Sequence, residues 1–310
     1  MSTHPAFQRA IDQSRRLRVD KPGKFRLEKI DPAGTGSFKS REDADGLLEQ
    51  GVATLRAQQE MLYAQDKWAV LLIFQAMDAA GKDGTIEHVM TGVNPQGCQV
   101  FSFKAPSAEE LDHDFLWRAS RSLPERGRIG IFNRSYYEET VVVRVHPEFL
   151  AKQRLPEQFT GKKIWRHRFE DINAFERYLS RNGVLIRKFF LHVSKAEQKE
   201  RFLARLDEPE KNWKFSAADV RERAHWPEYM AAFQEAIQST STGHAPWYVI
   251  PADNKWFTRL MVSAAIVDAL ESLSLSFPTI SAAEKKELAE ARAILLAEEK
   301  PASGKKRKAR

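Results

Sequence analysis

Five short apolar runs, separated by segments of helical periodicity, dominate the hydrophobic pattern of the chain. Each run is bounded by turn or helix signals, which is typical of buried strands. The runs are Trp68–Phe74, Cys98–Phe103, Arg128–Asn133, Leu185–Val193 and Trp247–Pro251. Because predicted helices alternate with them, the pattern indicates βαβ units and an α/β fold, with a mainly parallel sheet covered by helices on both faces. Ligands of such a sheet bind at the carboxyl ends of its strands.

Ser-x-x-Glu capping boxes mark three of the expected helix starts. In this motif the serine hydroxyl and the glutamate carboxylate each accept a hydrogen bond from a backbone N–H group at the helix start. Boxes begin at Ser107 and Ser194, each soon after a predicted strand, and at Ser281. The last box opens a helix rich in Ala, Glu, Lys and Leu over residues 281–300.

These signals divide the chain into three parts. Residues 1–60 lack strand signals and contain a turn-rich patch at Asp31–Ser40, so we expect an arm that wraps the core or mediates assembly. Residues 61–275 carry all five predicted strands and form the core. Residues 276–310 contain the last helix and the basic run GKKRKAR, which we expect to be a disordered tail.

The composition is that of a globular protein, with 42% hydrophobic and 29% charged residues among 310. No apolar run approaches the roughly 20 residues that span a bilayer, and the polar start lacks the apolar stretch of a secretory signal, so we expect a cytoplasmic protein. Cys98 is the only cysteine, which excludes an internal disulfide and a cysteine-based zinc cluster. The formal charge of +7 favours polyanionic partners, but charge alone does not rank nucleic acid, phosphate polymer and anionic membrane.

The loop after the first predicted strand carries the first candidate chemistry. It runs from Ala76 to Thr85 and leads into a helix-like segment. In a strand–loop–helix layout, backbone N–H groups and the helix N-terminus point at phosphate oxygens, and a lysine adds a mobile positive charge. Two positions depart from the pattern G-x-x-x-x-G-K-[ST], since Ala76 replaces the first glycine and Asp83 replaces the hydroxyl residue. The predicted phosphate-binding residues of the loop are Ala79, Ala80, Gly81, Lys82, Asp83, Gly84 and Thr85.

Carboxylates in and near this loop point to a metal ion. Asp78 and Asp83 are poor choices for a phosphate cradle unless a divalent cation such as Mg²⁺ bridges them to the phosphates. A second cluster, Asn133 to Glu139, follows the third strand in the layout of a Walker-B element, in which carboxylates hold the metal. Arg134 in this cluster has forked donors that suit phosphate oxygens. The alternative without function for the loop is an Asp-rich turn, and for the second cluster it is a surface ion pair between Arg134 and a neighbouring glutamate.

A third cluster of cations lies further along the chain, interleaved with aromatic residues. In nucleotide kinases a mobile helical lid carries such cations over the phosphates and excludes water. A solvated pair of amphipathic helices would give much the same pattern. The cations are Arg201, Arg205, Lys211, Lys214, Arg221 and Arg223.

Taken together, these segments resemble the polyphosphate kinase 2 family, most closely its single-domain class III members. The resemblance covers roughly residues 25–270 and rests on specific motifs, among them MDAAGKDGTI and GRIGIFNRSYYEE. The segments are Met77–Ile86, Gly92–Arg118, Gly127–Glu139, Arg205–Ser216 and Ala245–Phe257. It implies a P-loop kinase fold with a five-stranded parallel sheet sandwiched by helices and a helical lid at about 205–230. It also implies reversible phosphoryl transfer between polyphosphate and nucleoside mono- and diphosphates.

The same resemblance implies roles for individual residues. Asp78 and Glu138 would hold Mg²⁺, with Mn²⁺ as a substitute, and Lys82 would contact the phosphate in transit. Asn133, Arg134 and Glu138 would complete the catalytic centre, while Arg205, Lys214 and Arg223 would grip phosphates from the lid. A homo-oligomer, dimer or tetramer, is also implied.

Two positions depart from the family pattern. Ala76 stands where members usually have glycine, and a Cβ would cost about 1 to 2 kcal/mol if the loop needed a positive φ there. Glu87 stands where members often carry lysine.

Two other functions compete with this reading. One is a nucleotide kinase that takes ATP as donor and ignores polyphosphate. The other is a non-catalytic P-loop protein that binds polyanions through its basic surface, which the substitution at Ala76 would favour. We expect inorganic polyphosphate and nucleotides as partners, and neither membrane nor nucleic acid.

Overall fold

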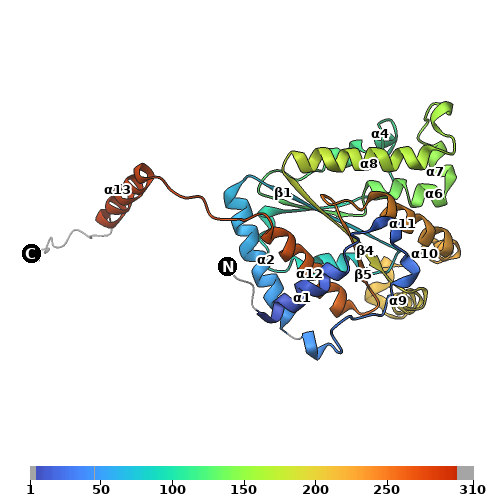
Figure 1. Cartoon of the computed structure of the whole chain (residues 1–310), viewed down its shortest axis with the longest axis horizontal. Coiled ribbons are helices and arrows are strands. Elements are labelled where there is room, and N and C mark those ends of the chain that lie inside the picture. Colours follow the sequence, from blue (N-terminus) through green and yellow to red (C-terminus); the bar gives the residue numbers. More distant parts are fainter. Residues whose placement is uncertain (1–4, 45, 299–310) are drawn as a thin grey trace, which may run out of the picture. The chain divides into compact units, whose positions relative to one another are not determined.

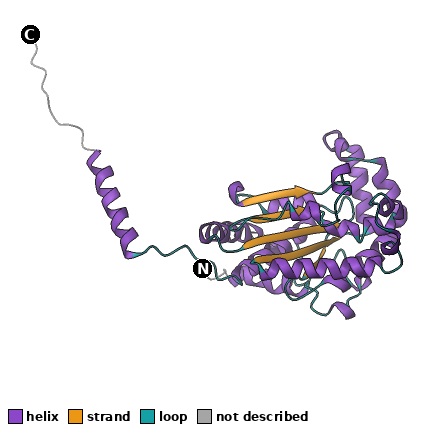
Figure 2. Ribbon diagram, turned by 90° about the horizontal axis from the view of Figure 1, so that it is seen from above, coloured by secondary structure: helices purple, strands orange, loops and turns teal. Residues whose placement is uncertain are grey.

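The computed structural model describes residues 5–44 and 46–298, and its centre is a five-stranded parallel sheet. The strand order is β2-β3-β1-β4-β5, and every neighbouring pair is parallel. Figure 2 shows the strands running between layers of helix. All five predicted strands are confirmed, each to within two residues at either end. The strands are β1 (Ala69–Ala76), β2 (Cys98–Ser102), β3 (Ile129–Asn133), β4 (Val184–His192) and β5 (Trp247–Pro251).

Helices connect the strands, and several begin at the predicted caps. Ser107 forms a complete capping box with Glu110, and the Ser194 hydroxyl accepts from the N–H of Glu197. The α-helices are α1 (Pro5–Arg16), α2 (Leu47–Gln65), α3 (Lys82–Val89), α4 (Ala108–Leu111), α5 (Trp117–Ser120), α6 (Val142–Val145), α7 (Pro147–Ala151), α8 (Ile164–Arg181), α9 (Lys195–Asp207), α10 (Ala217–Glu222), α11 (Trp226–Thr240), α12 (Lys255–Glu271) and α13 (Ala282–Glu298). Short 3₁₀ turns include η5 (Tyr136–Glu139), η7 (Pro209–Lys214) and η8 (Arg223–His225).

The N-terminal part of the chain is built into the same compact unit as the sheet. Helices α1 and α2 pack against α12 on one face of the sheet, while α8 covers the other face (Figure 1). The packing is close at Gly51 of α2, where a Cβ would lie 2.5 Å from the Ser263 hydroxyl and 2.7 Å from the Phe7 ring. Val19 N–H donates to the Trp247 carbonyl, so this segment also forms an isolated antiparallel bridge with β5.

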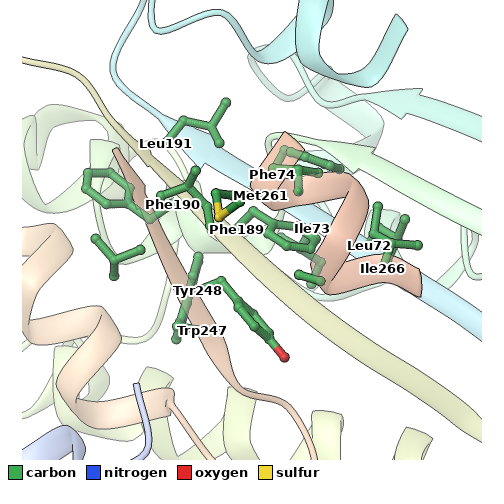
Figure 3. Close-up of a cluster of buried hydrophobic side chains, with 14 of the residues drawn as sticks. Leu72, Ile73, Phe74, Phe189, Phe190, Leu191, Trp247, Tyr248, Met261 and Ile266 are labelled. Carbon is green, nitrogen blue, oxygen red and sulfur yellow. The ribbon is translucent and has the colours of Figure 1, made fainter. Parts of the chain in front are cut away.

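The hydrophobic core extends over both faces of the sheet, and one part of it lies between β1, β4, β5 and helix α12. Figure 3 shows Met261 and Ile266 of α12 packed against these strands. Phe74 of β1 stacks on Phe189 of β4 with ring centroids 5.0 Å apart. Because burying one such side chain stabilises the fold by roughly 1.5–3 kcal/mol, this layer fixes the strands and therefore the loops at their carboxyl ends.

A buried polar network supports the segment after β3. The Lys188 ammonium of β4 donates to the Glu176 carboxylate at 2.6 Å and to the Tyr137 hydroxyl at 2.8 Å, and both charged side chains are fully buried. The hydroxyls of Tyr136 and Tyr137 both donate to Glu176. This network anchors η5, and Glu138 comes next after the two tyrosines.

The contacts between residues separate a second unit, Ser276–Arg310, from the first. It contains α13, whose capping box at Ser281 and Glu284 is present as predicted. The basic run at 304–310 lies outside the described residues. Within the described ranges, no helix is long and apolar enough to cross a membrane.

Candidate active site

The loop between β1 and α3 curls through two left-handed residues. Ala79 has φ +59° and Gly81 has φ +99°, a region that glycine enters without steric cost. Left-handed residues that alternate with residues of negative φ, as Ala79 and Gly81 do with Ala80 between them, make successive N–H groups converge on an anion. Helix α3 begins at Lys82, so the positive end of its dipole faces the same loop.

Arg201 of α9 holds the outer side of this loop. The side chain is 9% exposed, and its guanidinium donates to the carbonyls of Ala79 and Ala80 at 3.1 and 2.8 Å. It also donates to the carbonyls of Ala252 and Asp253, in the loop after β5, at 2.6 and 3.0 Å. In a planar trans peptide the C=O and N–H groups point in opposite directions, so this clamp turns the next N–H groups away from α9.

Lys82 folds back over the end of β1. Its ammonium donates to the carbonyls of Ala76 and Met77 at 2.9 and 3.3 Å, and the residue as a whole is 8% exposed. Burial, and next the positive charge of Arg134, lower the pKa of Lys82. The ammonium therefore sits where an anionic ligand would stabilise its charge.

Ala76, which stands where family members usually have glycine, does not have the strained backbone conformation that a positive φ would impose. It is the last residue of β1 and is not among the described residues with positive φ. The φ-dependent cost of a Cβ at this position is therefore absent.

Arg134 joins the ends of β1 and β3. It follows β3 with a strained φ of +64°, held by a bond from its N–H to the Phe74 carbonyl at 3.0 Å. Its guanidinium donates to the Asp78 carboxylate at 2.7 Å. Burial opposes the charge of Arg134, but Glu138 and Asp78 outweigh it and raise its pKa. The ion pair thus spans two loops and is not the local surface pair considered from sequence.

Two further predicted residues complete this edge of the sheet. The Asn133 amide donates to the Asp83 carboxylate at 2.6 Å. Glu138 is partly buried, and burial raises its pKa although Arg134 and Lys82 lower it. Its neighbour Glu139 instead binds the buried Arg168 at 2.7 Å. The structure therefore brings Asp78, Lys82, Asn133, Arg134 and Glu138 together at the carboxyl ends of β1 and β3.

A cleft of about 880 Å³ opens over the loop, and basic side chains outnumber acidic ones in its lining. All the predicted loop residues from Ala79 to Thr85 line it. Sequence reasoning did not single out Lys104, Lys255 and Arg259 among its cations, although the last two follow β5 and a strand end is where ligands bind. Burial lowers the pKa of Arg259, and the nearby carboxylate of Glu87 partly offsets this.

A second, more enclosed pocket of about 300 Å³ lies on the other side of Asp78 and Arg134. Its walls include Glu138 and several apolar and aromatic side chains, such as Phe149 and Phe233. The two cavities share Asp78, Phe103, Lys104 and Arg134. Of the residues predicted to be catalytic, Asp78 and Arg134 therefore line both cavities. Lys82 and Asn133 line the cleft only, and Glu138 lines the enclosed pocket only.

The predicted lid segment corresponds to η7, α10 and η8 together with the end of α9. Arg205 and Lys211 line the cleft, and Arg205 lies 4.0 Å from the Asp219 carboxylate of α10. Burial, and next the charge of Asp78, raise the pKa of Asp219. The Lys214 side chain lies outside what the structure describes. Arg223 is not brought into the cleft, because its guanidinium bonds to α9.

A model of the family described as polyphosphate kinase 2 matches residues 38–278, more than two thirds of the chain. The chain belongs to the polyphosphate kinase 2 family. An ADP-polyphosphate phosphotransferase of Rhodopseudomonas palustris is 56% identical over 270 residues, covering 86% of this chain and 92% of that protein. An AMP/ADP-polyphosphate phosphotransferase of Meiothermus ruber is 43% identical over 274 residues, covering 88% and 98%.

Solved structures agree with this assignment. The crystal structure of polyphosphate kinase 2 from Arthrobacter aurescens is similar with a TM-score of 0.79 and 40% sequence identity, over 88% of this chain and 95% of that one. The family resemblance and the α/β P-loop kinase fold predicted from the sequence are thus confirmed.

Proposed function

We propose that this chain is a polyphosphate:nucleotide phosphotransferase that moves phosphoryl groups reversibly between inorganic polyphosphate and nucleoside mono- and diphosphates. The observation that carries the proposal is the meeting of two unlike cavities at Asp78 and Arg134. A large basic cleft suits a polyanionic chain, and a more enclosed, partly apolar pocket suits a nucleoside. The names of its relatives support the same pair of substrates.

The protein groups act mainly by alignment and charge neutralisation. Phosphoryl transfer needs little covalent chemistry, and its barrier falls when positive groups meet the charge that develops on the transferred phosphoryl. Lys82 and Arg134 are both positioned to do this from fixed sites beside the loop. The clamp by Arg201 keeps the loop pre-organised, which reduces the reorganisation required on binding.

We also propose Mg²⁺ as the cofactor, with Mn²⁺ as a substitute. Among the described residues, no group of three or more His, Cys, Asp or Glu is placed to enclose a metal. This suits Mg²⁺, which proteins hold through one or two carboxylates together with substrate phosphates and water. Asp78 and Glu138, which both lie close enough to Arg134 to raise its pKa, are the residues that would hold it. When bound, the ion would offset the negative charge of the phosphates.

A donor-swap assay tests the activity. The protein is given ADP, Mg²⁺ and long-chain polyphosphate as the only phosphoryl donor, and ATP is measured with luciferase; AMP and GDP are compared as acceptors by chromatography. We expect ATP from ADP, and ADP from AMP. Nucleotide phosphorylation with ATP but not with polyphosphate would instead identify a nucleotide kinase. If the folded protein shows no turnover with either donor, the remaining alternative is a non-catalytic protein that binds polyanions.

The predicted role of Asp78 gives this assay a matched control. Asp78→Asn should lower turnover at least about 100-fold, because the group facing Arg134 loses its charge. Asp171→Asn makes the same change on the exposed surface of α8 and should leave turnover unchanged. Equal activity in the two variants would contradict the role of Asp78.

We further propose that the enzyme acts in the cytoplasm, where its nucleotide substrates are held, and that it is a dimer or tetramer, as the family resemblance implies. Light scattering coupled to size-exclusion chromatography tests the assembly. A single species of monomer mass at micromolar concentration would contradict it.

A further inference from the structure

A buried glutamine connects the lid segment to the phosphate loop. Gln198 lies on α9 and is 1% exposed. Its amide oxygen accepts from the Arg223 guanidinium at 2.6 Å, and its amide nitrogen donates to the Asp78 carbonyl at 2.8 Å. One rigid amide therefore bonds to the lid on one side and to the phosphate loop on the other.

The bond to Asp78 is placed where a small shift changes the site. Asp78 is the first of three successive loop residues whose carbonyls are held by α9, since Arg201 holds those of Ala79 and Ala80. The peptide plane that carries the Asp78 carbonyl also carries the N–H of Ala79. It is bonded to the Cα of Asp78, whose side-chain carboxylate pairs with Arg134. Rotation of the Gln198 amide would release this plane.

Arg223 fixes the orientation of that amide. It begins η8, directly after α10, and donates a second bond to the Lys195 carbonyl in the first turn of α9, at 3.0 Å. Without Arg223, the Gln198 oxygen would be left buried without this charged donor, so the amide would be driven to turn toward another partner. Both bonds come from one guanidinium nitrogen, Nη1, and together they hold the Arg223 side chain against α9.

We propose that Arg223 is a positioning residue that acts through Gln198 on the Asp78 peptide and so couples the lid segment to the geometry of the phosphate loop. The kinetic consequence rests on the proposed function, whereas the structural coupling does not. The role is distinct from the direct phosphate contact that the family resemblance implies for Arg223, which stays a prediction.

Hydrogen exchange measured by mass spectrometry, without substrates, tests the coupling itself. In Arg223→Ala, amides in the loop peptide spanning residues 76–90 should exchange several-fold faster than in the parent, although this peptide is remote from position 223 in sequence. Gln198→Ala should have the same effect. Arg223→Lys, which retains the positive charge but loses the planar guanidinium, should have an intermediate effect. Arg221→Ala, which removes an exposed lid cation, is the matched control and should leave the loop unchanged. Faster exchange confined to the lid in Arg223→Ala would overturn the proposal.

A double-mutant cycle tests the kinetic consequence. We expect Arg223→Ala and Gln198→Ala each to lower kcat about 10- to 100-fold, since a slightly misplaced loop is costly to catalysis, with KM for polyphosphate changed less than about twofold. The double variant should be no slower than the slower single variant, because both remove one linkage. Effects that multiply would show that Arg223 and Gln198 act independently, and a large rise in KM with normal kcat would show that Arg223 binds phosphate. Either result would overturn the proposal.

The two arms separate this inference from the proposed function. A parent protein without polyphosphate activity, but with loop exchange that responds to Arg223, would refute the function and support the coupling. The Arg223→Ala arm decides the question even where Gln198→Ala lowers the yield of folded protein.

Discussion

Replacing Lys82 with methionine tests whether the positive charge of this side chain serves catalysis or stabilises the fold. Methionine keeps most of the stem of the side chain and removes only the positive end. A positive charge about 4 Å from a phosphate oxygen, at an effective dielectric constant of about 20, contributes about 4 kcal/mol, or roughly 10³-fold in rate. Part of this also stabilises the bound substrates and does not accelerate transfer. We therefore expect Lys82→Met to lower kcat at least about 100-fold.

The same change should leave the fold intact. In the parent, Lys82 is buried with only two carbonyl acceptors, and burial lowers its pKa, so its charged form is disfavoured in the folded protein. Methionine removes that desolvation penalty and loses two hydrogen bonds, two effects of opposite sign. The free energy of unfolding should stay within about 1 kcal/mol of the parent value.

Both quantities are measured on the same preparations. Turnover is followed as ATP formed from ADP and polyphosphate, and stability by urea denaturation with circular dichroism. Lys67→Met, an exposed lysine just before β1, is the matched control and should change neither. Near-parent turnover in Lys82→Met would refute the argument, as would a loss of several kcal/mol in stability that accounts for the lost activity.

Three further outcomes follow from the packing and the electrostatics. Gly51→Ala should lower the free energy of unfolding by about 1–3 kcal/mol, because the added Cβ would clash with side chains of α1 and α12. Gly161→Ala is the control, since a Cβ there meets no atom within 4 Å, and equal stability of the two variants in urea would contradict the tight packing at Gly51. Lys188→Met should cost about 3–5 kcal/mol by leaving Glu176 buried without its partner, and adding Glu176→Gln should recover much of it; a single variant as stable as the parent would argue against the buried pair. Burial raises the pKa of Glu138 above its ordinary value of 4.5, so kcat should fall as the pH decreases and this carboxylate gains a proton. A pH–rate profile without this acidic decrease, or with the same decrease in Glu138→Gln, would contradict the role of Glu138.

The fold could be predicted because its signals are local in the sequence. Apolar runs such as Trp247–Pro251 and capping boxes such as Ser107–Glu110 depend on residues a few positions apart, and each appeared where expected. The N-terminal segment was harder. It has no strand of its own and its place is fixed by contacts with α12, nearly the whole chain away, so the pattern could not distinguish a loose arm from a packed one.

The candidate site divides in the same way. The loop from Ala79 to Thr85 and the cluster from Asn133 to Glu138 each follow a strand directly, and strand ends in a parallel sheet meet at one edge, so their proximity followed from the sequence. The sequence could not assign the cations of the lid segment. Arg201, Arg205 and Arg223 are the same residue type within one stretch of the chain. Yet Arg201 clamps the loop, Arg205 faces the cleft near Asp219, and Arg223 holds Gln198.

What the amino-acid sequence determined by itself is therefore the sheet, the phosphate loop and the family. Only the tertiary structure decided which cations face the cleft and which face protein, and that Ala76 sits in a strand without strain. The physical reason is that a guanidinium binds carbonyls and phosphates with the same donors. Its role is set by which acceptor the folded chain brings within hydrogen-bonding distance.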